Sequence, residues 1–259
     1  MGGRGQISLF VIIGLVLVIA AALFFSLANK SPLEIFDAAP SQEVQMVESA
    51  VENCLRRAAP DAIIPFFNQG FFYELPEERV RYEYIVPTDL LALPVITKTE
   101  IAPYFKQAFS LVPDEEAFQN NYALFVRDGV KKCFEESTLP GVEFTSGEPF
   151  VNAQIGTMTV ISLDYPITIT KSDGSEEIGD FSFDLEYDMK TKYEFIRGFV
   201  EGEVKDFLSI EKISSDAYDN YYTFDLININ EDDIAFRINY DDYKIKYDEY
   251  LILNFIVRY

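Results

Sequence analysis

The chain has 259 residues, of which 49% are hydrophobic and 15% aromatic, and its formal net charge is −22. This apolar content excludes a disordered chain, and the excess of acid argues against binding to nucleic acid. The sequence contains no histidine, which excludes Ser–His–Asp and Cys–His catalytic groups and zinc sites with imidazole ligands.

The N-terminal segment predicts one transmembrane helix over residues 7–28, which carry no charged side chain. At about 1.5 Å per residue this stretch spans a hydrocarbon core of about 30 Å. Arg4 precedes it, which favours a cytoplasmic tail over residues 1–6 and export of the remainder. The alternative is a secretory signal cleaved after Ala28, but the apolar run exceeds an ordinary signal core of about 7–15 residues.

The start of the chain resembles a known class of signal. Arg4-Gly5-Gln6-Ile7-Ser8-Leu9 ahead of a long apolar helix is similar to the class III signal of archaeal type IV pilin-like proteins. The resemblance implies cleavage by a prepilin peptidase between Gly5 and Gln6, with the helix retained. Phe10 stands where that family usually carries the glutamate that recruits subunits into a filament.

The whole chain also resembles an uncharacterised group of single-span surface proteins from small-genome archaea. The counterpart of their motif is Val51-Glu52-Asn53-Cys54-Leu55, on a helix soon after the membrane. This resemblance implies a placement at the cell surface and no particular activity.

A short linker over residues 29–41 follows the predicted span and contains Asn29-Lys30-Ser31, a candidate N-glycosylation site at Asn29. Arg4 and Lys30 are the charged residues among the first 30, so the rest of the chain carries −24. We therefore expect the exported domain to stand off an anionic membrane surface.

Helices are predicted first in the exported domain. Apolar residues at helical spacing predict a helix over residues 42–58 that Pro60 ends. The aromatic stretch 66–73 predicts a turn and strand in the core, with a ligand-stacking platform as the alternative. Thr97-x-x-Glu100 predicts a short helix through Phe109, and a longer helix is expected over residues 114–136.

Strands are predicted in the second half. Residues 157–187 alternate with period two around the turn 172–175, which predicts a hairpin. A helix over residues 190–208 and strands at 222–229, 234–240 and 250–259 complete the prediction. The domain 42–259 is therefore expected to be α+β, helix-rich over 42–138 and strand-rich with antiparallel pairing over 150–259.

The two cysteines, Cys54 and Cys133, lie on the apolar faces of predicted helices and follow an export signal. In an oxidising compartment they are expected to form a disulfide, which stabilises by about 4 kcal/mol through the loop that it closes. The alternative is two unrelated buried thiols.

Paired acids recur along the chain and are interpreted as solvated surface. Two carboxylates serve a glycosidase only when they face each other in a cleft, and the acidic stretch 241–250 lacks the spacing of a calcium loop. The six pairs are Glu77-Glu78, Glu115-Glu116, Glu135-Glu136, Glu176-Glu177, Asp232-Asp233 and Asp241-Asp242. No catalytic residue, metal ligand or cofactor is predicted.

The sequence thus predicts a single-pass membrane protein with a cytoplasmic N-terminus and an extracellular, non-enzymatic domain that binds a protein or another component of the cell envelope. A minor pilin-like subunit that self-associates through its N-terminal helix is the first alternative. An envelope hydrolase that depends on carboxylates is the second.

Overall fold

The structure is a computed structural model, and it describes residues 41–77, 79–86, 95–106, 109–172, 174–203, 222–228, 233–240 and 251–258. The chain divides into two compact units, Met1–Gln42 and Glu43–Tyr259. The predicted span 7–28, the processing site at Gly5 and Gln6 and the sequon at Asn29 lie outside the described residues. Within the described ranges, no helix is both long and apolar enough to cross a membrane.

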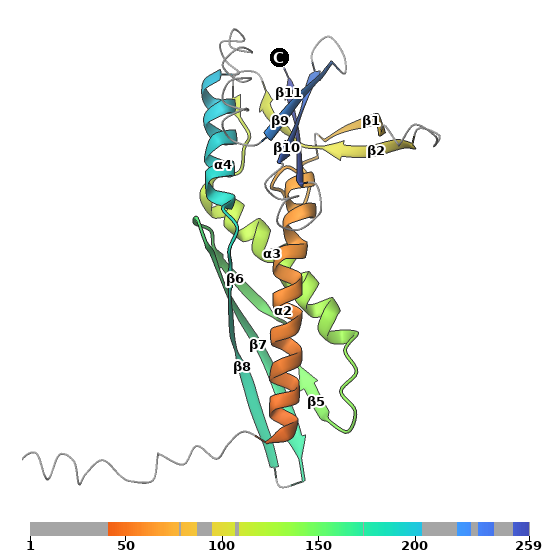
Figure 1. Cartoon of the computed structure of the whole chain (residues 1–259), viewed down its shortest axis with the longest axis vertical. Helices are drawn as coiled ribbons and strands as arrows, with labels where there is room; N and C mark the ends of the chain where they lie inside the picture. Colours follow the sequence, from red (N-terminus) through yellow and green to blue (C-terminus); the bar gives the residue numbers. More distant parts are fainter. Residues whose placement is uncertain are drawn as a thin grey trace, which may run out of the picture. The chain divides into compact units, whose positions relative to one another are not determined.

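The second unit combines helices with two larger sheets and a separate hairpin, so the α+β prediction is confirmed (Figure 1). Its helices are α2 (Gln42–Asn68), α3 (Glu115–Glu135) and α4 (Met189–Gly198), followed by the π-helical turn η1 (Phe199–Glu203). Its strands are β1 (Val80–Val86), β2 (Val95–Ile101), β3 (Pro103–Lys106), β4 (Phe109–Ser110), β5 (Glu143–Ser146), β6 (Phe150–Gln154), β7 (Thr159–Lys171), β8 (Gly174–Leu185), β9 (Tyr222–Asn228), β10 (Asp233–Tyr240) and β11 (Leu251–Arg258).

Helix α2 begins as predicted but continues through Pro60 and Pro65 to Asn68, so the predicted end at Pro60 was wrong. A proline removes the hydrogen bond to the carbonyl four residues earlier. Those carbonyls belong to Arg56 and Asp61, both exposed, where water can replace the lost bond. The extra turns bury hydrophobic side chains beyond Pro60, and this burial offsets the cost of the two prolines.

A Schellman motif ends α2. The N–H of Gly70 donates to the carbonyl of Phe67 and that of Phe71 to the carbonyl of Phe66, each at 2.9 Å. Gly70 and Phe71 both have positive φ, 64° and 63°, and the rings of Phe66 and Phe71 lie 5.3 Å apart. The predicted strand here is therefore a turn, while the prediction of buried core is confirmed for Phe66, Phe67 and Phe71; Phe72 and Tyr73 are partly buried.

Helix α3 lies where it was predicted, because its end signals are local. Asp114 caps it, its Oδ1 accepting the N–H of Ala117 at 2.8 Å. Tyr122 donates a hydrogen bond of 2.7 Å from its hydroxyl to the carbonyl of Ala59 in α2. A Cβ added to Gly129 would lie 2.9 Å from that of Ala58, so small residues allow α2 and α3 to approach closely.

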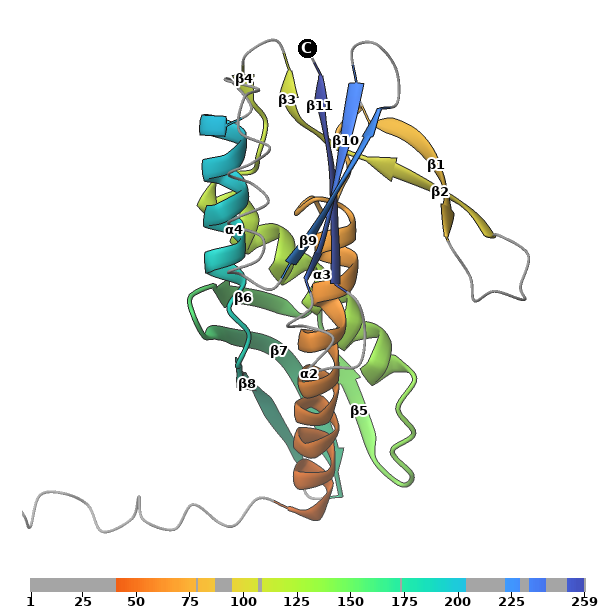
Figure 2. The ribbon, with the colours of Figure 1, turned by 45° about the horizontal axis from the view of Figure 1, so that its top comes forward.

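The sheet of β5 to β8 is built around β7, which pairs with β5 and β6 along one edge and β8 along the other. The predicted hairpin and its alternating burial along β7 are confirmed. Helices α2 and α3 pack on the inner face (Figures 1 and 2): the ring of Phe134 lies 5.4 Å from that of Tyr165, and Arg56 lies 5.8 Å over the ring of Phe183.

The second sheet has the order β4-β3-β11-β10-β9, with β3 parallel to β11 (Figure 2). The helix predicted over 97–109 was therefore wrong, since this segment forms β2, β3 and β4. The predicted strands at 222–229, 234–240 and 250–259 are confirmed as β9, β10 and β11 within the described residues. The predicted helix over 190–208 is described only to Glu203, as α4 and η1.

Candidate functional site

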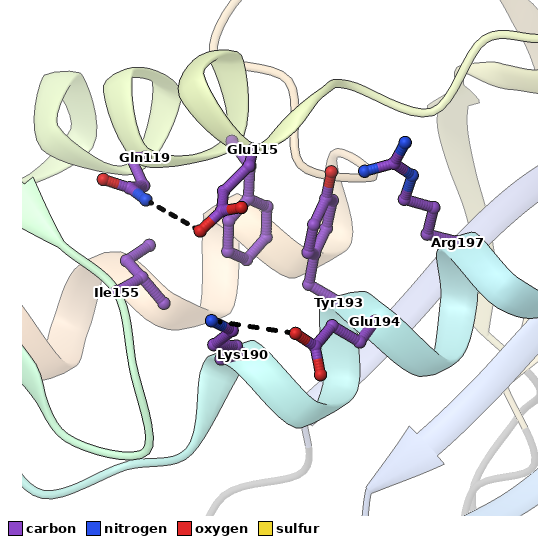
Figure 3. Close-up of a pocket in the computed structure, with 8 residues that line it drawn as sticks. Glu115, Gln119, Ile155, Lys190, Tyr193, Glu194 and Arg197 are labelled. Carbon is purple, nitrogen blue, oxygen red and sulfur yellow. Dashed lines mark hydrogen bonds and ion pairs between the residues drawn. The ribbon is translucent and has the colours of Figure 1, made fainter.

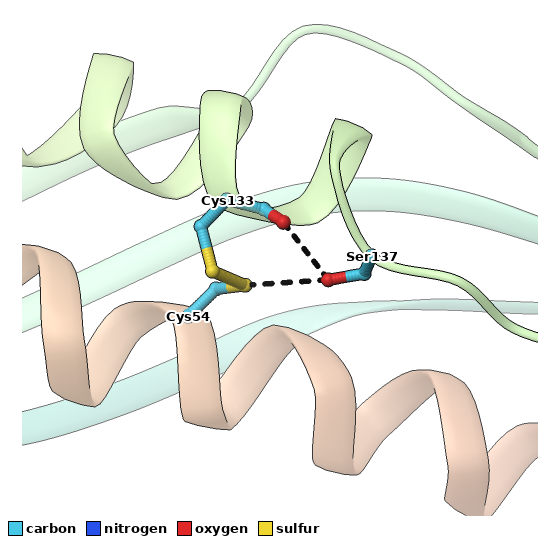
Figure 4. The surroundings of a disulfide bond; sticks show 3 residues. All are labelled: Cys54, Cys133 and Ser137. Atoms are coloured by element: carbon cyan, nitrogen blue, oxygen red, sulfur yellow. Dashed lines mark hydrogen bonds between the residues drawn. A yellow bond between two sulfur atoms is a disulfide. The ribbon is translucent and has the colours of Figure 1, made fainter.

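A disulfide joins α2 to α3, as predicted (Figure 4). Cys54 and Cys133 are 79 residues apart in sequence, and their Cα atoms lie 5.6 Å apart. The two cysteines differ in environment, because Cys54 is 2% exposed whereas Cys133 is only partly buried. The disulfide is therefore covered on the α2 side and more open on the α3 side.

Ser137, just beyond the end of α3, lies beside the disulfide (Figure 4). Its hydroxyl donates a hydrogen bond of 2.8 Å to the carbonyl of Cys133. The same oxygen lies 3.8 Å from Sγ of Cys54. A single hydroxyl thus bridges the end of α3 and the buried sulfur.

A groove of about 310 Å³ runs along the seam between α2 and α3 and reaches the disulfide. Its floor consists largely of small or apolar residues, because Ala58, Ala62 and Gly129 leave no large side chain to fill the seam. The lining residues are Arg57, Ala58, Asp61, Ala62 and Pro65 of α2 and Phe125, Gly129, Lys132, Cys133 and Glu136 on the side of α3. Cys133, and not Cys54, belongs to this lining.

Four exposed charges stand along the groove, and they are balanced in sign. Arg57 and Lys132 are cations, and Asp61 and Glu136 are anions. None of the four forms an ion pair with another side chain in the described part of the chain. The balance is unusual here, because the whole chain has 43 acids against 21 bases.

A smaller hollow of about 60 Å³ lies between the start of α3 and α4 (Figure 3). The stacked rings of Phe118 and Tyr193, 4.3 Å apart, form part of its wall. Its charges have partners within the chain: Lys190 pairs with Glu194 at 3.8 Å and Arg197 with Glu201 at 2.9 Å. This hollow has room for a few water molecules and offers less to a ligand than the groove.

Tyr193 closes the inner side of this hollow. Its hydroxyl donates a hydrogen bond of 2.8 Å to the carbonyl of Pro113. Burial raises the pKa of the Tyr193 phenol above its ordinary value. The side chain is therefore a neutral structural link between α4 and the segment before α3, and does not supply a proton acceptor at neutral pH.

The predicted acid pairs do not gather into a site in the described part of the chain. Asp164 of β7 and Asp180 of β8 are directly paired across strands, but both are exposed. Within the described ranges, no three His, Cys, Asp or Glu residues are grouped so that they could hold a metal ion. Glu78, Asp232, Asp241 and Asp242 lie outside those ranges.

The sequence predicts the disulfide but not the groove beside it. Two features of the sequence point to the groove. On each helix, two residues of opposite charge lie four positions apart: Arg57 and Asp61 on α2, and Lys132 and Glu136 at the end of α3. They flank the small residues of both helices. The sequence does not show that the two helices pack on each other and place these charges on the two sides of one groove.

Comparisons of the chain with protein-family models, with curated proteins and with solved structures gave no match.

Proposed function

We propose that the chain is a single-pass membrane protein that displays the unit 43–259 outside the cytoplasm, where this domain binds a protein or another component of the cell envelope. The observation that carries the proposal is the disulfide between Cys54 and Cys133. Disulfides persist in oxidising compartments, so the domain belongs on the exported side of a membrane. The uncharged stretch 7–28, with Arg4 before it, supplies the matching anchor.

The charge of the exported part supports display away from the lipid. Residues after Lys30 carry −24, given the +2 of the first 30 residues and the total of −22. An anionic leaflet repels such a surface within a Debye length. A displayed domain that stands clear of the bilayer is accessible to partners in the surrounding medium.

Membrane extraction tests the anchor. Leu15→Arg/Val18→Arg places two charges in the middle of residues 7–28, at about 2.5–3.5 kcal/mol each on insertion scales. We expect the wild-type chain to stay in the membrane pellet after an alkaline carbonate wash and the double variant to be released. Leu33→Arg, in the linker, is the control and should stay in the pellet. Release of the wild type would contradict the anchor.

Protease treatment of intact cells tests the orientation. A domain outside the cytoplasm is degraded without lysis, whereas a cytoplasmic control protein survives. Protection of the domain until the cells are lysed would overturn the proposed side of the membrane.

A minor pilin-like subunit is the second candidate, and the motif Arg4-Gly5-Gln6-Ile7-Ser8 favours it. Mass spectrometry of the native N-terminus distinguishes the two candidates in part. A chain that starts at Gln6 supports prepilin-type processing, whereas a chain that starts at Met1 contradicts it. Filaments in sheared cell fractions would then favour polymerisation over a stand-alone surface protein.

A further inference from the structure

The groove between α2 and α3 gives unequal access to the two cysteines of the disulfide. Cys133 lines the groove and is only partly buried, whereas Cys54 is 2% exposed and does not line it. A thiolate must reach a disulfide sulfur before exchange occurs. A small molecule in the groove therefore meets the Cys133 side first.

The groove also has the size and charge pattern of a binding site. Its volume of about 310 Å³ lies at the lower end of the range for small-molecule pockets, about 300–1,000 Å³. Arg57 and Lys132 can bind carboxylates, and Asp61 and Glu136 can bind ammonium groups. A ligand with charges of both signs matches this rim better than an anion or a cation alone.

We propose that the groove binds a small zwitterionic thiol, a compound with carboxylate, ammonium and thiol groups, which exchanges with the disulfide at Cys133. The thiol first loses its proton to solvent. The thiolate then forms a bond to Sγ of Cys133 while the bond between the two cysteine sulfurs breaks. The electron pair leaves on Sγ of Cys54, which takes a proton from solvent, so the bound thiol is oxidised to a mixed disulfide and Cys54 is reduced.

Ser137 is the positioning residue for this exchange. Its hydroxyl lies 3.8 Å from Sγ of Cys54, close enough to turn toward the sulfur as negative charge develops there. A hydrogen bond lowers the pKa of a departing thiolate, and thiolates of lower pKa leave faster. The buried Cys54 otherwise has an apolar environment that disfavours charge.

The exchange is measured on the folded full chain in detergent without denaturant. Glutathione is the zwitterionic probe, and 2-mercaptoethanol is the uncharged probe of thiol reactivity. We expect the rate to saturate with glutathione and to rise linearly with 2-mercaptoethanol. After an acid quench, tandem mass spectrometry should find the glutathione adduct on Cys133. A rate independent of thiol concentration, or an adduct mainly on Cys54, would overturn the proposal.

Two adjacent arginines provide a matched pair of variants. Arg57 lines the groove, whereas Arg56 contacts the ring of Phe183 and does not line it. Arg57→Glu should lower the glutathione rate, relative to the 2-mercaptoethanol rate, by about fivefold, the equivalent of one exposed ion pair. Arg56→Glu has the same change in net charge and should alter this ratio by less than about twofold. Equal ratios for the two variants would contradict binding in the groove.

Ser137 is tested separately. Ser137→Ala should slow exchange with both thiols, and Ser137→Thr should restore it, because threonine keeps the hydroxyl. Unchanged rates in Ser137→Ala would remove Ser137 from the mechanism. The exchange does not depend on whether residues 7–28 span a bilayer, so its failure leaves the proposed function standing.

Discussion

Tyr104 carries a buried hydroxyl to which the described part of the chain offers no acceptor. The residue is fully buried, and its ring stacks on that of Phe255 at 4.8 Å. In the described part of the chain its hydroxyl has no hydrogen-bond partner, which costs about 1–3 kcal/mol for a buried polar group. Tyr104→Phe keeps the ring and removes this cost. We expect the free energy of unfolding in urea to rise by about 1 kcal/mol.

Tyr122→Phe is the control with the opposite expected sign. The Tyr122 hydroxyl is also buried but donates to the carbonyl of Ala59 at 2.7 Å. Its removal should lower the free energy of unfolding by about 1 kcal/mol. If both variants were destabilised alike, the unpaired state of the Tyr104 hydroxyl would be refuted.

Alkaline pH gives an independent test of Tyr104. Burial raises the pKa of this phenol well above its ordinary value. In the unfolded chain Tyr104 ionises near pH 10. Below about pH 10 the phenol is therefore protonated in both states, and above it the free energy of unfolding of the wild type falls, because only the unfolded chain ionises readily. The stability difference between wild type and Tyr104→Phe should therefore widen above about pH 10 in favour of the variant. Parallel stability curves up to pH 11 would contradict this.

At the scale of elements, the end of α2 depends on Gly70. Its φ is +64°, and a Cβ there would lie 3.2 Å from Oη of Tyr104 and 3.3 Å from the carbonyl oxygen of Asn254. Gly70→Ala should thus cost about 2–3 kcal/mol from backbone strain and crowding together. Chemical denaturation with an unchanged m-value would measure it.

Gly141→Ala is the control that separates backbone strain from crowding. Its φ is +77°, but a Cβ there would have no atom within 4 Å. Gly141→Ala should therefore cost only the backbone strain, about 1 kcal/mol. If Gly70→Ala cost no more than Gly141→Ala, the close packing of Gly70 against β3 and β11 would not be a stabilising constraint.

Elements with strong local signals were predictable from sequence, and those decided by distant partners were not. Helix α3 has its cap at Asp114, and the β7–β8 hairpin has a period-two pattern with a turn between its strands. The segment 97–109 carries a capping-box pattern, but β2 pairs with β1 and β3 with β11. Val95, Ile96, Thr97 and Thr99 are β-branched and suit those strands, so tertiary pairing overrode the four-residue signal.

Of the candidate site, too, one part was predictable from the sequence and another was not. Helical periodicity placed Cys54 and Cys133 on the apolar faces of two helices, and together with the predicted export to an oxidising compartment it led to the prediction of their disulfide. The groove depends on the antiparallel packing of α2 on α3 around Ala58 and Gly129, which is a property of two helices together. The four charges form one balanced set only when the two helices pack together.

For the whole molecule, the disulfide acts on more than the two helices that it joins. The loop between Cys54 and Cys133 contains β1 to β4, so the bridge also restricts the unfolded chain that must form part of the second sheet. Because the cysteines are 79 residues apart in sequence, the loss of chain entropy predicts a stabilisation of about 4 kcal/mol. That is a large fraction of a typical domain stability of about 5–15 kcal/mol.

Cys54→Ser/Cys133→Ser tests this at the level of the whole domain. We expect its free energy of unfolding to fall by about 4 kcal/mol, because the unfolded chain regains its freedom while the α2–α3 packing is otherwise retained. Reduced wild type should match the double variant in urea unfolding, and added reductant should leave the variant unchanged. A loss below about 1 kcal/mol would mean that the unfolded chain already keeps the two helices together. The disulfide would then contribute little to the stability of the domain, and its main role would be the proposed exchange at Cys133.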